Sequence, residues 1–173
     1  MAEVKIYMAD VLDTELREYA MKRFGYGRGS ISTAAEEAIN RWVQREKRIE
    51  TVVKRIIDRA RSDKAVIAVL LYGSYTRKEP NYNDVDIALL LSHGVNVSNK
   101  VFEYSGLLGG NDDRLFDMTA VNSMPTEMQS EVLSNGIFVY VGDTKALDKY
   151  NYSVLTEWED FRPIFNLIAG SGK

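Results

Sequence analysis

The most constraining feature of the sequence is a pair of apolar runs of strand length in the second half of the chain. Residues 65–72 read Ala-Val-Ile-Ala-Val-Leu-Leu-Tyr, and residues 84–91 read Asp-Val-Asp-Ile-Ala-Leu-Leu-Leu. Short continuous apolar runs that are rich in β-forming residues are typical of strands buried on both faces. The sequence therefore predicts a sheet that other elements cover.

Further elements of the second half are predicted from the spacing of apolar residues and from the residues that begin or end helices and strands. Strands are expected at 114–121 and 137–141, with a helical or irregular stretch at 96–108 between them and the first two strands. Pro125 starts a helix that ends near Asn135-Gly136, and helical spacing of aromatic residues over 158–168 predicts a terminal helix. The fold class that we expect is α+β, a small mixed β-sheet with flanking helices.

Composition removes several kinds of chemistry. The 173 residues include no cysteine and one histidine, so zinc-finger, thiol and histidine-cluster chemistry are excluded, and any metal must be held mainly by oxygen. No apolar run approaches the ~20 residues that a membrane helix needs, and the acidic N-terminus does not fit a secretory signal. We expect a cytoplasmic protein without a membrane partner.

The first part of the chain differs in charge and pattern. Residues 1–62 hold 13 basic and 10 acidic side chains, a net +3, and the remainder holds 9 against 15, a net −6. Alternation over 3–9 predicts an amphipathic strand. A helix is expected from Asp13 or Thr14 to Phe24 and a second from Ser30 or Ser32. Its apolar stripe lapses at 44–48 and resumes, which fits one long helix or two.

This strand, helix, glycine-bearing turn and helix resemble the ribbon-helix-helix family over residues 3–45. The strands of that family pair across a dimer, which fits a segment too small to close its own core. The resemblance implies a homodimer, and it places Lys5 and Tyr7 among the outward side chains that would contact DNA. Two readings stay open, a dimerisation segment and a DNA-binding one, since a net +3 is a weak phosphate-binding charge.

Acidic residues in the second half carry the informative chemistry. Asp84 and Asp86 are two apart on a strand, so their carboxylates share one face. Asp117 lies inside another strand, where a charge is costly unless a cation compensates it. If the two strands are neighbours, three carboxylates converge, and oxygen ligands of this kind suit Mg²⁺ or Mn²⁺.

Phosphate-binding groups are expected just upstream. Gly73-Ser74 follows the first buried strand at once, and a tight turn there exposes backbone amides and a hydroxyl to a phosphate. Arg77 and Lys78 lie about one turn later. Hydrogen-bond donors that bind phosphate, placed beside carboxylates that bind metal, are typical of sites for phosphoryl or nucleotidyl transfer.

Together, Leu-Tyr-Gly-Ser-Tyr-Thr-Arg at 71–77 and Asn-Asp-Val-Asp-Ile-Ala-Leu-Leu at 83–90 resemble the nucleotidyltransferase superfamily that includes DNA polymerase β, in a minimal form, over roughly 64–142. The resemblance implies that Gly73 and Ser74 bind the triphosphate and that Arg77 assists; Lys78 is expected to bind the nucleotide because its positive charge adjoins Arg77. The resemblance also implies that Asp84, Asp86 and Asp117 hold the metals, with Asp117 helping to activate the acceptor hydroxyl. The chain departs from the family at Lys78, where glycine is usual, and at Asn83, where serine is frequent.

The resulting prediction is an Mg²⁺-dependent nucleotidyltransferase that transfers a nucleoside monophosphate from a nucleoside triphosphate to an acceptor hydroxyl. The expected donor is ATP, which would transfer AMP. Only about 30 residues follow the fourth strand, so the acceptor is expected on a partner protein, and minimal forms of the family are often antitoxins that modify a toxin. We expect a ribbon-helix-helix-like segment at 1–48, a connecting helix at 49–63 and the nucleotidyltransferase domain at 64–173. The alternative is a DNA-binding transcriptional regulator whose second domain binds nucleotide without catalysis.

Overall fold

A computed structural model describes residues 5–79, 82–109 and 114–170 of the chain. The chain forms two compact units, residues 1–48 and residues 49–173. Within the described residues, no helix is both long enough and apolar enough to cross a membrane.

The first unit is a pair of helices, α1 (Asp10–Phe24) and the beginning of α2 (Ser30–Arg61). The turn between them contains Gly25 at a φ of 87°, a left-handed conformation that glycine adopts without strain. The buried Ser30 hydroxyl donates to the carbonyl oxygens of Gly25 and Gly27, which ties the turn to the start of α2. The two helices predicted here are confirmed, although α1 begins at Asp10, before the predicted Asp13 or Thr14.

The strand predicted at 3–9 is absent from the part of that range that the structure describes. Residues 5–9 are described and have no regular structure, and residues 3 and 4 lie outside the described part. A strand needs a neighbour to accept and donate its ladder hydrogen bonds, and the sheet of the second unit contains only strands from that unit. The ribbon-helix-helix resemblance is therefore unconfirmed in its strand.

The question of one helix or two between Ser30 and Arg61 is settled, since α2 is continuous over 32 residues. The polar stretch at 44–48 does not interrupt it. The apolar face beyond that stretch is buried in the second unit, through Ile49, Val52, Ile56 and Ala60. This end of α2 is therefore one wall of the second unit's core.

The second unit is built on a four-stranded mixed sheet of order β3-β2-β1-β4. Its strands are β1 (Val66–Tyr72), β2 (Val85–Leu91), β3 (Phe116–Ala120) and β4 (Ile137–Val141). β1 is antiparallel to both of its neighbours, and β2 is parallel to β3. The parallel pair brings the beginnings of β2 and β3 to the same edge of the sheet. All four strands were predicted within two residues.

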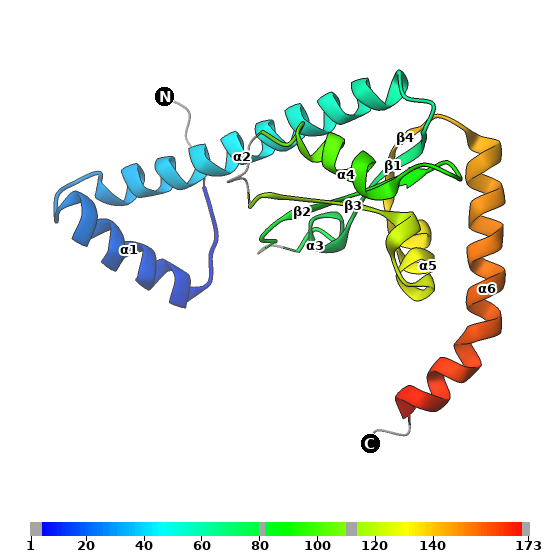
Figure 1. Ribbon diagram of the computed structural model, residues 1–173. Helices are drawn as coiled ribbons and strands as arrows, with labels where there is room; N and C mark the ends of the chain where they lie inside the picture. Colours follow the sequence, from blue (N-terminus) through cyan, green and yellow to red (C-terminus); the bar gives the residue numbers. More distant parts are fainter. Residues whose placement is uncertain (1–4, 80–81, 110–113, 171–173) are drawn as a thin grey trace. The chain divides into compact units, whose positions relative to one another are not determined.

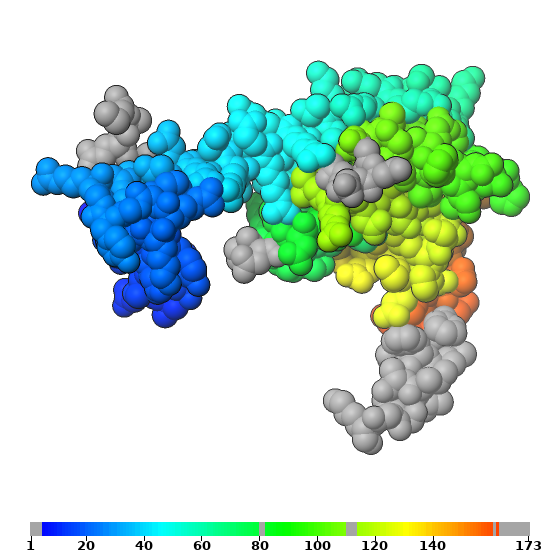
Figure 2. Space-filling view, turned by 60° about the vertical axis from the view of Figure 1, so that its left-hand side comes forward, coloured from blue at the N-terminus to red at the C-terminus, as the bar shows by residue number. Residues whose placement is uncertain are grey.

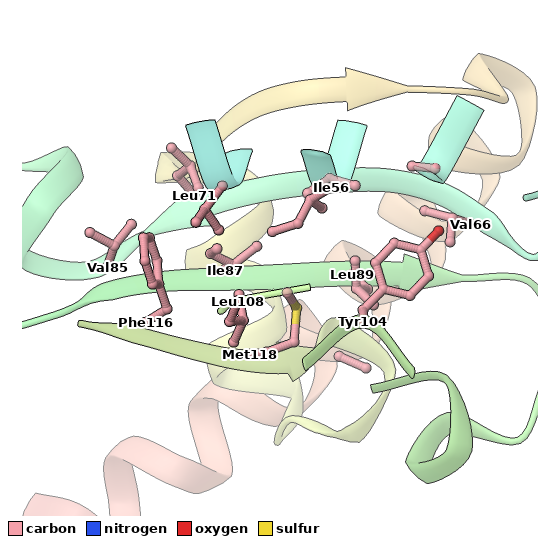
Figure 3. Close-up of a cluster of buried hydrophobic side chains, with 14 of the residues drawn as sticks. Ile56, Val66, Leu71, Val85, Ile87, Leu89, Tyr104, Leu108, Phe116 and Met118 are labelled. Atoms are coloured by element: carbon pink, nitrogen blue, oxygen red, sulfur yellow. The ribbon is translucent and has the colours of Figure 1, made fainter. Parts of the chain in front are cut away.

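Helices cover both faces of the sheet, as the apolar runs predicted. Figure 1 shows α4 (Val97–Ser105) and the end of α2 on one side and α5 (Thr126–Asn135) on the other. On the first side the alternate strand residues meet Ile56 and Tyr104, and Figure 3 shows these side chains facing one another. The strand members of this cluster are Val66, Val69, Leu71, Val85, Ile87, Leu89, Leu91, Phe116, Met118 and Ala120.

The other face packs against α5 and α6 (Thr144–Gly170), which lie next to each other on the surface in Figure 2. Val132 of α5 and Val154 of α6 pack against its buried strand residues, which are Ile67, Ala68, Leu70, Ala88 and Leu90. α6 is much longer than the predicted terminal helix. The described side chains of α6 that pack on the sheet lie between Ala146 and Val154, and of the residues that predicted this helix only Trp158 has a described side chain.

Two polar clusters anchor one end of the sheet, where β1 begins and β2 ends. The Asn122 amide, in a short 3₁₀ turn at Val121–Ser123, accepts from the N–H of Leu91 at 2.8 Å and donates to its carbonyl oxygen at 3.0 Å. At the end of α2, Asp63 accepts hydrogen bonds from Lys100 at 2.9 Å and from the Tyr104 hydroxyl at 3.3 Å. These contacts hold β2 and α4 in place and thereby support the strand that carries Asp86 and begins directly after Asp84.

Candidate active site

Three polar residues form a row across the sheet at the edge where β2 and β3 begin. Asp86 is in register with Tyr72 of β1 on one side and with Asp117 of β3 on the other. Because residues in register share a face, all three side chains lie on the face that packs against α5. Asp84 is the residue directly before β2. Because it is two residues from Asp86, its side chain is expected on the same face. The predicted meeting of the Asp84–Asp86 strand with the Asp117 strand is therefore observed.

The electrostatics of the row agree with this arrangement. Burial raises the pKa of Asp86, and the negative charges of Asp84 and Asp117 raise it further. Burial, with the charges of the same three aspartates, raises the pKa of Tyr72 to about 12. Like charges this close favour protonation unless a cation joins them. The row is thus a place where a positive group is stabilised.

Gly73 begins the four-residue helix α3 (Gly73–Thr76) at the end of β1, with a φ of 76°. A Cβ at this position would overlap Oδ2 of Asp86 and lie 3.0 Å from its Cγ. Only glycine allows the backbone to approach the carboxylate so closely while adopting a left-handed conformation. The turn is closed by the Thr76 hydroxyl, which donates to the Gly73 carbonyl oxygen at 2.9 Å. The predicted Gly73-Ser74 turn is therefore present beside Asp86, and it opens a short helix.

The two basic residues that follow are exposed. The Arg77 guanidinium forms an ion pair with Glu79 at 2.6 Å, which raises the pKa of Arg77, and the charges of Glu131 and Asp86 act on it in the same direction. Lys78 has a φ of 57°, which is unusual for a residue with a side chain. This conformation explains physically why glycine suits the position, one of the two at which the chain departs from the family pattern.

A cavity of about 390 Å³ opens between α3 and α5 next to the row. Tyr72 and Gly73 belong both to its wall and to the site just described. The rest of the wall comes from α3 and from one face of α5 with its following glycine: Thr76, Arg77, Met128, Glu131, Val132, Asn135 and Gly136.

The donor set fits a divalent cation in its chemistry, since carboxylate oxygens are the ligands that Mg²⁺ and Mn²⁺ prefer. Within residues 5–79, 82–109 and 114–170, however, no three Asp, Glu, His or Cys side chains already stand close enough together to hold a metal ion. Asp117 is exposed and Asp86 is half-buried.

The other predicted site residues lie apart from this group in the chain. Lys5 and Tyr7 are exposed in the first unit, with the Lys5 ammonium 5.0 Å from the centre of the Tyr7 ring. Sequence reasoning missed Tyr72 and the cavity residues of α5. Tyr72 could have been found, because it adjoins Gly73 and ends a strand, whereas Glu131 and Asn135 carry no signal without knowledge of how α5 packs.

Residues 54–145, slightly more than half of the chain, match the family model described as "Polymerase beta, Nucleotidyltransferase". No curated protein matches the chain.

Similar folds occur among solved structures. A toxin–antitoxin complex with AMP-PNP aligns with a TM-score of 0.53 and 17% identity over 73% of this chain and 96% of the other. A complex of tri-AMPylated HEPN toxin with MNT antitoxin from Shewanella oneidensis gives 0.53 and 16% over 73% and 97%. The toxin–antitoxin pair MntA-HepT gives 0.53 and 16% over 70% and 97%. At these identities the likeness establishes the α+β fold.

Proposed function

We propose that this chain, which belongs to the polymerase beta nucleotidyltransferase family, transfers AMP from ATP to an acceptor hydroxyl on a partner protein and releases pyrophosphate. The family makes it a nucleotidyltransferase, and the donor nucleotide and acceptor are the proposed parts. The observation that carries the proposal is the register of Asp86 with Asp117 beside a glycine turn that no larger residue could form in the same way.

The phosphates are assigned to the α3 turn. Gly73 and Ser74 offer backbone amides and a hydroxyl at the end of β1, and Arg77 and Lys78 supply positive charge from the exposed side of the turn. The ion pair between Arg77 and Glu79 is exposed and therefore weak, so Arg77 can exchange Glu79 for a phosphate oxygen.

The carboxylates are assigned to the metal and to the acceptor. Asp84, Asp86 and Asp117 would hold Mg²⁺ or Mn²⁺, which when bound neutralises charge on the phosphates and aligns the displacement. Asp117 is the most exposed member of the row, so it is also the group that an incoming acceptor hydroxyl can reach and to which the hydroxyl proton can pass.

A partner protein as acceptor is supported by the similar folds, which include an antitoxin in complex with an AMPylated toxin. ATP as donor is supported by the similar toxin–antitoxin structure with AMP-PNP. We therefore place the chain in a toxin–antitoxin pair as the antitoxin. The division into a segment at 1–48, a connecting helix at 49–63 and a catalytic domain at 64–173 is part of the same proposal.

The first unit is proposed to form a homodimer. Its exposed apolar side chains include Leu12, Tyr19, Ile39 and Trp42, and Trp42 is 60% exposed. Packing these side chains against a second copy would remove a large apolar surface from water and thereby stabilise the dimer. DNA binding through residues 3–45 is the second candidate function, favoured by the exposed Lys5 and Tyr7.

Label transfer tests the enzymatic proposal. The purified chain, Mg²⁺ and a cell extract are incubated with ATP that is radiolabelled either at the α-phosphate or at the γ-phosphate. We expect addition of the chain to place α-label on a protein and to add no γ-label beyond that of the extract alone, since a kinase would give the reverse. An Asp84→Asn/Asp86→Asn variant should transfer neither label. Absence of α-label transfer by the wild-type chain, or its persistence in the variant, would contradict the proposal.

A further inference from the structure

The cavity between α3 and α5 has a fixed relation to the phosphate turn. Tyr72 and Gly73 form part of its wall, and Gly73 is also in contact with the Asp86 carboxylate. A nucleotide whose phosphates lie at Gly73-Ser74 therefore has its nucleoside within reach of this cavity. The volume of about 390 Å³ lies in the range of about 300–1,000 Å³ that small-molecule sites occupy.

One face of α5 supplies the far wall. Met128, Glu131, Val132 and Asn135 have helical spacing, so they line a single side of the helix. Met128 and Val132 give an apolar surface suited to the flat face of a base. The side chains of Glu131 and Asn135 make no hydrogen bond or salt bridge to any other described residue, although both line the cavity. Their oxygen and nitrogen atoms are free to bind a ligand.

We propose that this cavity holds the base of the donor nucleotide, and that Asn135 and Glu131 select adenine by its edge. This inference rests on the proposed function. An amide side chain can accept a hydrogen bond from the exocyclic N6 amine of adenine and donate one to the ring nitrogen N7. The Glu131 carboxylate accepts from the second hydrogen of the same amine. A purine with an oxygen in place of this amine points a hydrogen-bond acceptor at the side-chain oxygens of Asn135 and Glu131, which are acceptors too. Such a purine is therefore disfavoured.

Competitive nucleotide binding to the full chain tests the inference without requiring transfer. ATP or ITP, each with Mg²⁺, displaces a ribose-labelled fluorescent ATP, and the ratio of the two affinities is the readout. ITP differs from ATP at the exocyclic group of the base. We expect the wild-type chain to prefer ATP by about tenfold or more, and Asn135→Ala or Glu131→Gln to reduce that preference by about tenfold.

Two variants of α5 are matched controls. Glu127→Gln removes the same charge one turn earlier, and Ser134→Ala truncates the neighbour of Asn135, and neither residue lines the cavity. Both should keep the wild-type preference. Met128→Trp, at a position 42% exposed, should fill the cavity and weaken ATP and ITP equally with little change in melting temperature.

The outcomes separate the two proposals. A wild-type chain that binds no nucleoside triphosphate overturns the proposed function and this inference together. A chain that binds ATP but keeps its preference in both Asn135→Ala and Glu131→Gln overturns the inference alone. The same holds if these variants change only the concentration of acceptor needed for label transfer, since the cavity would then hold the acceptor.

Discussion

Substituting Gly73 by alanine should damage the site more than the fold, and the chain provides its own control. Gly73 and Gly94 have nearly equal φ values, 76° and 81°, but a Cβ at Gly94 meets nothing within 4 Å. The backbone cost of alanine in this conformation is about 1–2 kcal/mol at either position. Only Gly73→Ala must also displace the Asp86 carboxylate.

The displacement has a small energetic and a large functional effect. Rotating Asp86 away from its rotamer costs about 0.5–1.5 kcal/mol, so Gly73→Ala should lose about that much more unfolding free energy than Gly94→Ala. At about 2–4 °C per kcal/mol, thermal unfolding followed by circular dichroism resolves this difference. Moving a carboxylate by an ångström or more should lower α-label transfer about 100-fold, while Gly94→Ala should leave it unchanged. Equal transfer and equal melting temperatures in the two variants would refute the described contact.

Three further predictions concern stability. Lys78→Gly should raise the unfolding free energy by about 0.5–1 kcal/mol, because it relieves the φ of 57°, and Lys78→Ala should give no gain in the same urea titration. Asn122→Ala should lower it by about 1–3 kcal/mol, since the N–H and carbonyl oxygen of buried Leu91 lose their partner; an unchanged urea midpoint would contradict this. Burial opposes ionisation of Asp63, but hydrogen bonds from Lys100 and the Ala65 N–H outweigh it and hold its pKa below the usual value. The wild-type chain should therefore lose stability as the pH falls from about 4 through that lowered pKa, and Asp63→Asn should lack this part of the pH dependence.

The strands were predictable because their signals are local. The run at 65–72 and the five residues 137–141 are apolar and bounded by turn residues, and the second prediction matches β4 residue for residue. The start of α1 was predicted too late because Asp13 and Thr14 are good capping residues. The helix instead begins at Asp10 after Ala9, whose side chain makes no capping hydrogen bond. Here the acidic first turn replaces a cap.

The site was predictable as far as it depended on spacing along one strand. Asp84 and Asp86 share a face by alternation alone, and Gly73 precedes them by a short loop. The sequence predicted that Asp117 joins the site only on the condition that its strand lies beside the strand of Asp84 and Asp86. Strand order and register are set by packing between segments distant in sequence, so the sequence alone does not decide this. Tyr72, Glu131 and Asn135 were missed for the same reason, because cross-strand register and the orientation of α5 bring them to the site. The strand at 3–9 needs a partner segment that the sequence of one chain does not identify.

The central claim is that Asp84, Asp86 and Asp117 act as one oxygen-donor site together with a nucleotide. Binding of Mn²⁺ to the full chain, measured by electron paramagnetic resonance with and without ATP, tests it most directly. The account predicts tight Mn²⁺ binding that depends on ATP, weakened about tenfold or more in Asp86→Asn and in Asp117→Asn. Binding should be unchanged in Asp58→Asn, which removes an exposed carboxylate paired with Arg61. Equal Mn²⁺ binding by all three variants and the wild-type chain would contradict it.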